Sequence, residues 1–283
     1  MGDLITYMAA PFAVCLVLTG IHTYLGTHVL ARGVIFVDLA LAQIAALGTT
    51  MAFLLGFAVV SSQSYWISLL FTFVGAAVFS FSRLDEEHVP QEAIIGITYV
   101  VASAIAILAV DRAPHGAEHI KYLLVGSILW VTWPEVLKTA VIYALIGLFH
   151  WRFRDKFTLI SNDPDEARSR GLNLKLWDFL FYASFGFVIT SSVRIAGVLL
   201  VFSFLIVPSV ISALFTRSLS SRLIIGWSLG FLVSAVGSAL SFTLDLPTGA
   251  TIVVTFGAAL LVTRVLYPFW RAREETEAKP IEV

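Results

Sequence analysis

The sequence has 283 residues, of which 58% are hydrophobic and 13% are charged, and its mean hydropathy is +0.90. Ordinary soluble domains contain about 25% charged residues, so this composition excludes a water-soluble globular core. The net charge of −1 gives no electrostatic support for nucleic-acid binding. A single cysteine, Cys15, excludes an internal disulfide framework, and its apolar surroundings predict a packing role.

Long apolar runs indicate an all-α membrane protein. Only helical bundles and closed barrels span lipid, and continuous runs such as 140–149 and 195–215 favour helices over alternating barrel strands. The first residues, MGDLITYMAAPF, contain no basic region. They predict a retained span rather than a cleaved signal peptide.

The apolar runs predict a polytopic bundle of eight or nine transmembrane helices, since one span needs roughly 20 apolar residues. The sixth and seventh spans are separated only by residues 192–194, and Gly48 in the overlong second span suggests a broken helix. A count of eight therefore stays open. The nine predicted spans are 4–25, 34–60, 65–82, 93–110, 134–150, 176–192, 195–215, 223–244 and 250–267.

The basic residues orient this bundle, because short loops rich in Lys and Arg stay in the cytoplasm. If the loop 155–175 is cytoplasmic, strict alternation of nine spans places all but four of the 18 basic residues on that side. We therefore expect a cell-membrane protein with its N-terminus outside, or inside if there are eight spans, and a cytoplasmic C-terminus. Residues 1–270 form one transmembrane domain, and 271–283 form a charged, disordered tail.

Polar side chains within the spans are candidate functional groups, because burying them in lipid is costly. His22 lies in the first span, Asp38 and Gln43 lie in the second, and Glu92 opens the fourth. Two carboxylates and an imidazole suit a divalent cation. The alternatives are that Asp38 pairs with Arg32, that Glu92 interacts with the helix dipole, and that Gln43 makes a hydrogen bond between helices.

The outer loop 111–133 contains His115, Glu118 and His119 in the pattern H-x-x-E-H. This spacing also occurs in inverted zinc peptidases, although Pro114 disfavours a long helix here. Three hypotheses remain: a membrane zinc peptidase, an outer mouth that attracts metal ions, and a solvated loop.

No phosphate-binding loop is present in the sequence. None of the five lysines occupies the G-x-x-x-x-G-K-[ST] pattern that cradles nucleotide phosphates. The chain therefore does not hydrolyse ATP through such a loop, and any pumping would use an ion gradient or a separate subunit. The lysines are Lys121, Lys138, Lys156, Lys175 and Lys279.

The segment 155–175, DKFTLISNDPDEARSRGLNLK, is the longest polar interval between the first and last spans. Asn162, Asp163 and Pro164 predict a helix start with Asn162 as the cap. Residues 165–170 make about two turns, and Gly171 ends them. The result is a short helix parallel to the membrane, which is either an amphipathic connector or a docking helix for a partner.

Six stretches together resemble the permease subunits of the ABC-3 family of zinc, manganese and iron importers. Their order and spacing are specific, although each stretch alone is short, and they extend over nearly the whole chain. They are 26–48 (GTHVLARGVIFVDLALAQIAALG), 92–96 (EAIIG), 122–127 (YLLVGS), 163–171 (DPDEARSRG), 197–208 (GVLLVFSFLIVP) and 244–252 (LDLPTGATI).

The resemblance implies a permease subunit, not an enzyme, of an ATP-driven importer for zinc or manganese. It implies a second permease copy, a separate cytoplasmic ATPase, an extracytoplasmic metal-binding protein and no permanently bound cofactor. A gradient-driven metal carrier is the alternative. The resemblance also implies a coupling helix that sits in a groove of the ATPase, formed by Asp163, Pro164, Asp165, Glu166, Ala167, Arg168 and Gly171.

The sequence departs from this family where metal selectivity would be set. Family members carry an Asp and a His in the second span, together with an acidic residue that matches Glu92. Measured back from Gly48, the family His falls on Gln43 and the family Asp falls on Leu39, one residue after Asp38. Glutamine is a poorer zinc ligand than imidazole. Either Asp38 substitutes with a small change of register, or another group such as His22 does, or the metal differs.

Overall fold

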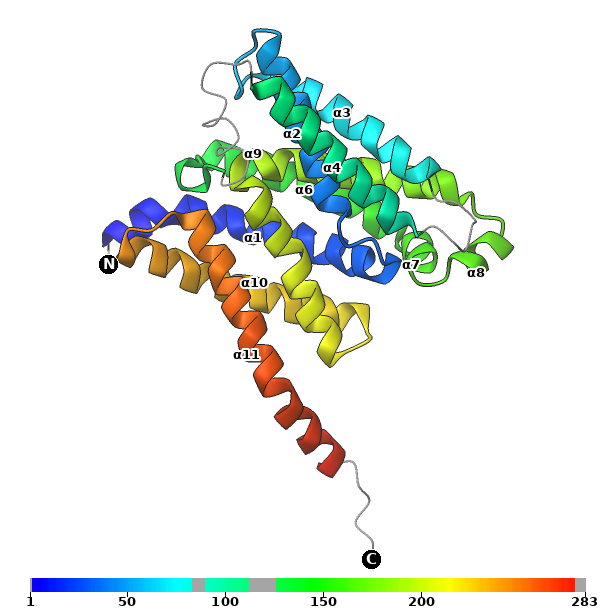
Figure 1. Cartoon of the computed structure of the whole chain (residues 1–283). Coiled ribbons are helices and arrows are strands. Elements are labelled where there is room, and N and C mark those ends of the chain that lie inside the picture. The colour runs from blue at the N-terminus through cyan, green and yellow to red at the C-terminus, as the bar shows by residue number, and fades with distance from the viewer. Residues whose placement is uncertain (1, 83–89, 112–125, 278–283) are drawn as a thin grey trace, which may run out of the picture.

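The molecule is a bundle of helices (Figure 1). The computed structural model describes residues 2–82, 90–111 and 126–277, and the side chains of 7–82, 90–111 and 126–268. Within these ranges the regular elements are helices and no strand occurs, which confirms the predicted all-α membrane fold. In chain order the elements are α1 (Gly2–Arg32), α2 (Val37–Leu54), α3 (Ser62–Phe81), α4 (Gln91–Val110), the 3-10 turn η1 (Ile128–Trp130), α6 (Trp133–Arg152), α7 (Arg154–Asn162), α8 (Pro164–Ser169), α9 (Leu174–Phe215), α10 (Leu219–Leu244) and α11 (Thr248–Glu277).

Helices α1 and α9 form the centre of the bundle. α9 packs against α1, α2, α3, α10 and α11, and α1 also contacts α6 and α10. At Gly26 the two central helices approach closely, because a Cβ atom there would lie 2.1 Å from the carbonyl oxygen of Leu205. Small residues allow such approaches in membranes, where van der Waals packing drives helix association.

Gly48 does not break the second span. α2 is a continuous helix through Gly48 and ends at Leu54, so the predicted broken helix over 34–60 is wrong. Instead, a Cβ atom at Gly48 would lie 2.7 Å from the Cα atom of Ser68 in α3. The Ser68 hydroxyl donates to the Ala45 carbonyl at 2.7 Å. The glycine therefore serves close packing of α2 against α3.

The two predicted spans 176–192 and 195–215 are the two halves of α9. The helix has 42 residues, and its backbone leaves the helical region at Gly197, with φ 76° and ψ 161°. This conformation is accessible mainly to glycine, so the break lies at Gly197 rather than at 192–194. Figure 1 shows the second half of α9 turning away from the first. A straight helix of this length would reach about 63 Å, twice the hydrocarbon thickness.

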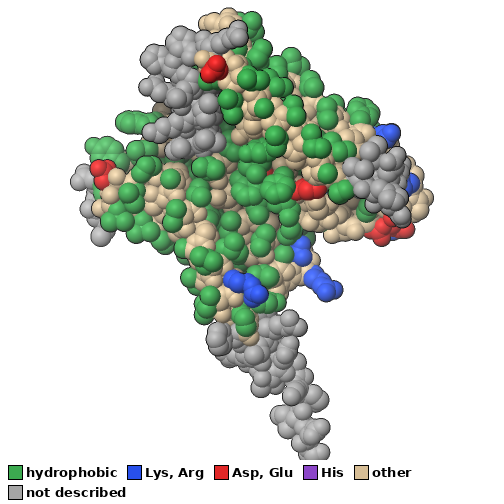
Figure 2. All heavy atoms as spheres, viewed as in Figure 1, with side chains coloured by type: hydrophobic (Ala, Val, Ile, Leu, Met, Phe, Trp, Pro, Cys, Tyr) green, Lys and Arg blue, Asp and Glu red, His purple; other side chains and the backbone are tan. Residues whose placement is uncertain are grey.

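The span count agrees with the predicted architecture. Seven of the described helices are long and apolar enough to cross a membrane, and α6 with α7, bent by 74°, makes an eighth. α9 is counted once in this total, so treating its halves separately adds one further span. Figure 2 shows apolar side chains over most of the visible face, as expected for a surface in contact with lipid.

The last helix, α11, extends past residue 270, the predicted end of the transmembrane domain, as far as Glu277. The disorder expected of the tail 271–283 stays a prediction. Residues 278–283 lie outside the described residues.

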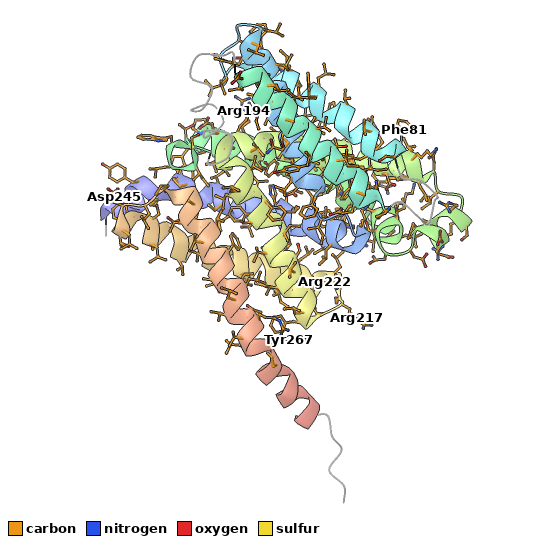
Figure 3. The ribbon with its side chains drawn as sticks, in the orientation of Figure 1. Phe81, Arg194, Arg217, Arg222, Asp245 and Tyr267 are labelled. Atoms are coloured by element: carbon orange, nitrogen blue, oxygen red, sulfur yellow. The ribbon has the colours of Figure 1, made fainter. Side chains whose placement is uncertain are left out.

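The two ends of the bundle carry different charges. Figure 3 places Arg194 and Asp245 toward one end, and Arg217 and Arg222 toward the other. Helices α7 and α8 lie at the same end as Arg217 and Arg222 (Figure 1). The α7–α8 end therefore carries Arg217 and Arg222 in addition to the mixed charges of α7 and α8.

Candidate functional site

The short helix α8 is built from local signals in the sequence. The Asp163 side chain caps it by accepting a hydrogen bond from the Glu166 amide at 2.9 Å, and Pro164 is its first residue. The cap is therefore Asp163, and the prediction that Asn162 caps the helix is wrong. Asn162 is instead the last residue of α7, and its side-chain amide donates to the Thr158 carbonyl at 2.9 Å.

The end of α8 follows the prediction. Gly171 adopts a positive φ of 76°, and the Leu172 amide donates to the Ala167 carbonyl at 3.1 Å. This is the left-handed ending that glycine favours. Ala167 is buried in a small apolar cluster with Ile160 and Leu174, so α8 rests on α7 and on the start of α9.

The outer surface of α8 is charged. Asp165 and Arg168 lie 3.5 Å apart, and Arg170 pairs with Glu166 at 2.7 Å. The hydrogen bond from Arg170 holds the pKa of Glu166 below its ordinary value, with a further contribution from Ser169. α8 therefore presents a short, capped, charged surface that faces away from the bundle.

A buried polar cluster ties α7 to the centre of the bundle. We call His28, Arg32, Ser161 and Asp178 the anchor cluster. Arg32 donates from Nε to the Ser161 hydroxyl at 2.9 Å and from Nη1 to Asp178 at 2.6 Å. The Ser161 hydroxyl also hydrogen-bonds Nδ1 of His28 at 2.9 Å. The side chains of Arg32 and Asp178 are 4% and 0% exposed.

Aromatic side chains enclose the anchor cluster. The Arg32 guanidinium lies 4.1 Å from the centre of the Phe181 ring. His150 of α6 stacks on Phe157 of α7, with ring centres 4.4 Å apart, and hydrogen-bonds the Ser184 hydroxyl at 2.8 Å. Helices α1, α6, α7 and α9 therefore meet at one rigid junction. Ser161 precedes the cap of α8 by only two residues, so α8 cannot shift far without moving this junction.

Sequence reasoning missed the anchor cluster. Asp178 lies within the predicted span 176–192, where a charged residue is itself a signal of function or pairing. Its partner could not be identified from the chain, because Arg32 is 146 residues away. The hypothesis that Arg32 pairs with Asp38 is wrong, because the Arg32 side chain reaches α9 instead.

The two predicted metal-binding carboxylates both lie at the start of α2. Oε1 of Glu92, in the first turn of α4, accepts a hydrogen bond from the Phe36 amide at 3.0 Å. Phe36 is the N-cap of α2, and Asp38 lies in its first turn. The carboxyl groups are close enough to interact electrostatically. Glu92 thus lies in the first turn of its own helix α4, as the sequence interpretation had it, and also at the positive end of the α2 dipole, which the sequence did not predict.

One atom of this pair has no partner. Oε2 of Glu92 is buried and makes no hydrogen bond to any described residue. Asp38 is buried and accepts the Leu39 amide at 2.7 Å. Buried polar atoms are normally satisfied, and each exception needs an explanation. A cation bound beside Glu92 would satisfy this oxygen.

The other predicted ligands do not join the carboxylates. Nδ1 of His22 hydrogen-bonds the Leu18 carbonyl at 2.8 Å, and Nε2 hydrogen-bonds the Ser192 hydroxyl at 3.2 Å. Both ring nitrogens are therefore occupied within the bundle. Gln43 is half-buried on α2. Within the described ranges, no three His, Cys, Asp or Glu side chains group together to hold a metal ion.

The histidine-rich outer loop cannot be placed. His115, Glu118 and His119 lie outside the described residues, so the three hypotheses for this loop stay predictions.

The fold defines a polytopic membrane protein, with the short charged helix α8 exposed at one end of the bundle. The chain matches the ABC 3 transport family over residues 5–267, and it belongs to that family. The family comprises transport permeases, so the chain is a membrane subunit of a transporter rather than an enzyme.

Known relatives agree with this membership. The chain is 28% identical to a probable iron transport system membrane protein of Haemophilus influenzae, covering 67% of this chain and 69% of the relative. It is 23% identical to a chelated iron transport system membrane protein of Yersinia pestis, with 99% and 95% covered. It is 22% identical to a manganese import system permease protein of Streptococcus parasanguinis, with 86% and 84% covered.

A solved structure shares the fold. PsaBC from Streptococcus pneumoniae, determined in complex with a Fab, superposes with a TM-score of 0.76 at 20% identity. The superposition covers 93% of this chain and 94% of that one. The predicted family resemblance is therefore confirmed.

Proposed function

We propose that the chain is the permease subunit of an ATP-driven importer for divalent metal ions. Family membership and the iron and manganese transport systems among its relatives support this proposal. The observation that carries it is the half-buried Glu92 carboxylate near Asp38 at the start of α2, whose buried Oε2 atom has no described partner. The family also argues against both a gradient-driven carrier and a zinc peptidase.

The ligand chemistry favours a hard divalent cation. Carboxylate oxygens suit Mn²⁺, whereas imidazole and thiolate suit Zn²⁺. The two carboxylates lack a neighbouring imidazole among the described side chains, because both nitrogens of His22 are engaged elsewhere. We therefore propose manganese or ferrous iron ahead of zinc. A second copy of the chain facing the first would double the number of carboxylates to four.

Helices α4 and α11 are the surfaces proposed to meet a second copy. In each, only 17% of the apolar span is buried, compared with 72% in α2. The Glu92 carboxylate begins α4, so pairing through this helix would place the two candidate sites near a common path between the copies.

The α7–α8 end is proposed to face the cytoplasm and to dock on a separate ATPase. Arg217 and Arg222 lie toward this end (Figure 3), as expected for the cytoplasmic side. The anchor cluster supports coupling, because a push on α8 reaches α1 and α9 through Ser161. An extracytoplasmic binding protein would deliver the ion at the opposite end, where Arg194 and Asp245 lie.

Transport by the reconstituted complex tests this proposal. The full chain, co-expressed with its ATPase and placed in proteoliposomes, should accumulate Mn²⁺ only when ATP is present and metal-loaded binding protein is supplied. Accumulation driven by a proton gradient without ATP would contradict the proposal. Strong Zn²⁺ uptake that Mn²⁺ does not inhibit would overturn the metal assignment and leave the transport class intact.

A further inference from the structure

A deep groove between α1, α6 and α10 has no role in the proposed transport path. Its volume is about 610 Å³. Its lining includes Val17 and Ile21 of α1 and Ala144 and Gly147 of α6. These small side chains on α6 leave the space open. The groove lies on the α1 and α10 side of the bundle, whereas the candidate metal ligands lie on α2 and α4.

The groove has the length of one lipid leaflet. Its lining extends from Leu16 to Tyr24 on α1 and from Ala140 to Trp151 on α6. At 1.5 Å per residue these segments measure about 12 and about 16 Å. Half of a hydrocarbon core is about 15 Å. The lining segments are the second half of α6 and the first turns of α10, so the groove spans the leaflet on the α7–α8 side.

The end of the groove near α7 is polar. Arg154 and Ser220 line it there, together with the ring of Trp151, whereas Trp227 lies deeper in the groove, where its Nε1 donates to the Gly20 carbonyl at 3.1 Å. Arg154 is exposed, and its nearest acidic partner, Asp155, is 3.7 Å away and fully accessible to solvent, so this pairing is weak. Tryptophan side chains concentrate at the membrane–water interface. The groove therefore has an apolar body and a cationic, aromatic mouth at the interface.

We propose that this groove binds one anionic phospholipid, with an acyl chain along α1 and the phosphate at Arg154. Basic pockets between membrane helices on the cytoplasmic side bind anionic lipid head groups, and this groove combines such a mouth with a leaflet-length apolar slot. A second copy of the chain is the less suitable occupant, because α4 and α11 offer far larger unburied apolar faces. The lipid wedges between α6 and α1 beside the bend that leads into α7.

Lipid retention by matched variants tests this proposal. Purified full-length chain in detergent is titrated with phosphatidylglycerol and, separately, with phosphatidylcholine, and the bound lipid is counted by native mass spectrometry. Arg154→Ala should lower the affinity for phosphatidylglycerol about fivefold, the contribution of one cation near a membrane surface. Arg152→Ala is the control, because this neighbouring arginine is exposed but does not line the groove.

A second pair of variants tests the apolar slot. Ala144→Trp fills the groove and should abolish retention of the tightly bound lipid. Val141→Trp is the control, since Val141 is 51% exposed on the same helix and lies outside the groove. Equal losses in Arg154→Ala and Arg152→Ala, or full retention by Ala144→Trp, would overturn the proposal. Efficient disulfide cross-linking between copies that carry Gly147→Cys would also overturn it, because it would assign the groove to the second copy.

Discussion

The anchor cluster and the carboxylate pair are both polar groups within the bundle, but their charges are balanced differently. In the anchor cluster, Arg32 bonds both Ser161 and Asp178, and these bonds join three helices, although Nη2 of Arg32 and Nε2 of His28 have no described partner. In the carboxylate pair, two acidic groups interact at one helix start without a described cation beside them, and Oε2 of Glu92 has no described partner. The first arrangement stabilises a shape by itself. The second becomes favourable when a cation neutralises it.

This difference suggests separate roles: the anchor cluster would serve the structure of the bundle, and the carboxylate pair would serve metal transport. Changes in the anchor cluster should act mainly on stability and on the link to α8. Changes in the carboxylate pair should act on metal transport with little effect on stability. The following experiments test the separation, from the largest expected effect to the smallest.

Arg32→Gln should cause the largest loss of stability. It leaves the Asp178 carboxylate buried without its cation, and breaking a buried pair costs about 3–5 kcal/mol. Thermal unfolding in detergent should show a large fall in Tm. Arg168→Gln is the control, because Arg168 is 54% exposed and surface pairs contribute about 1 kcal/mol or less. A double variant, Arg32→Leu with Asp178→Leu, should recover most of the stability lost in Arg32→Gln. If it does not, the loss is not due to breaking the Arg32–Asp178 ion pair.

Glu92→Gln should lower metal uptake about tenfold or more, which corresponds to 1.4 kcal/mol or more of binding energy. The amide oxygen still accepts the Phe36 amide, so Tm should change little. Uptake of radioactive Mn²⁺ by cells that express the whole transporter measures the effect. Glu135→Gln is the matched control, because Glu135 also caps a helix start by accepting the Thr132 amide at 2.8 Å. Equal losses in both variants would point to capping rather than to metal binding.

Glu166→Ala should uncouple ATP hydrolysis from transport by several-fold without unfolding the bundle. The substitution removes the partner of Arg170 on the proposed docking surface. Transport per ATP hydrolysed is the measurement, and Asp155→Ala, an exposed carboxylate on α7, is the control. An unchanged transport ratio after the whole of α8 is scrambled would exclude the coupling role.

The ion pair between Arg170 and Glu166 also predicts how coupling depends on pH. The pKa of Glu166 is lowered in the folded chain by Arg170 and Ser169. The ion pair therefore stabilises the fold at a pH above the pKa that Glu166 has in the unfolded chain. This stabilisation is lost as the pH falls through the lower pKa that Glu166 has in the folded chain. Coupling should be constant at neutral and mildly acidic pH and weaken only in the strongly acidic range. A loss of coupling near neutral pH would implicate a different group.

Gln43→His should have the smallest effect, a shift of less than about tenfold toward zinc in competition with manganese. The family resemblance implies an imidazole at the corresponding register, whereas this chain has a half-buried amide there. Competitive uptake of the two metals measures the shift, and Gln43→Asn serves as the control. An unchanged preference would show that this side chain does not reach the metal.

Local sequence signals predicted some features well. Pro164 and Gly171 correctly bounded α8, because a fixed proline φ and a glycine with positive φ act within a few residues. The cap was misplaced by one residue, since Asn162 and Asp163 are both good caps and only the path of α7 decides between them. The two glycines Gly48 and Gly197 also show what local signals leave undecided. Gly48 permits close packing of α2 against α3, whereas Gly197 breaks α9, and the sequence alone does not distinguish these roles.

The sequence predicted the proximity of the two carboxylates but not their surroundings, and their role as metal ligands stays a prediction. Asp38 and Glu92 both lie at the start of α2, as their positions near the inner ends of their spans suggested. His22 does not join them, because the rotation of α1 turns its ring toward Ser192. Hydropathy locates a residue along the membrane normal but contains no information about helix rotation.

The sequence by itself determined the class of the protein, the approximate spans, the absence of a phosphate-binding loop and the place of the exposed α8 helix. These features depend on composition and on neighbouring residues. Only the tertiary structure decided that Arg32 pairs with Asp178, that Ser161 links them to α8, and that a leaflet-length groove remains beside α1. In lipid every buried polar group needs a partner, but three-dimensional packing alone selects which one it finds.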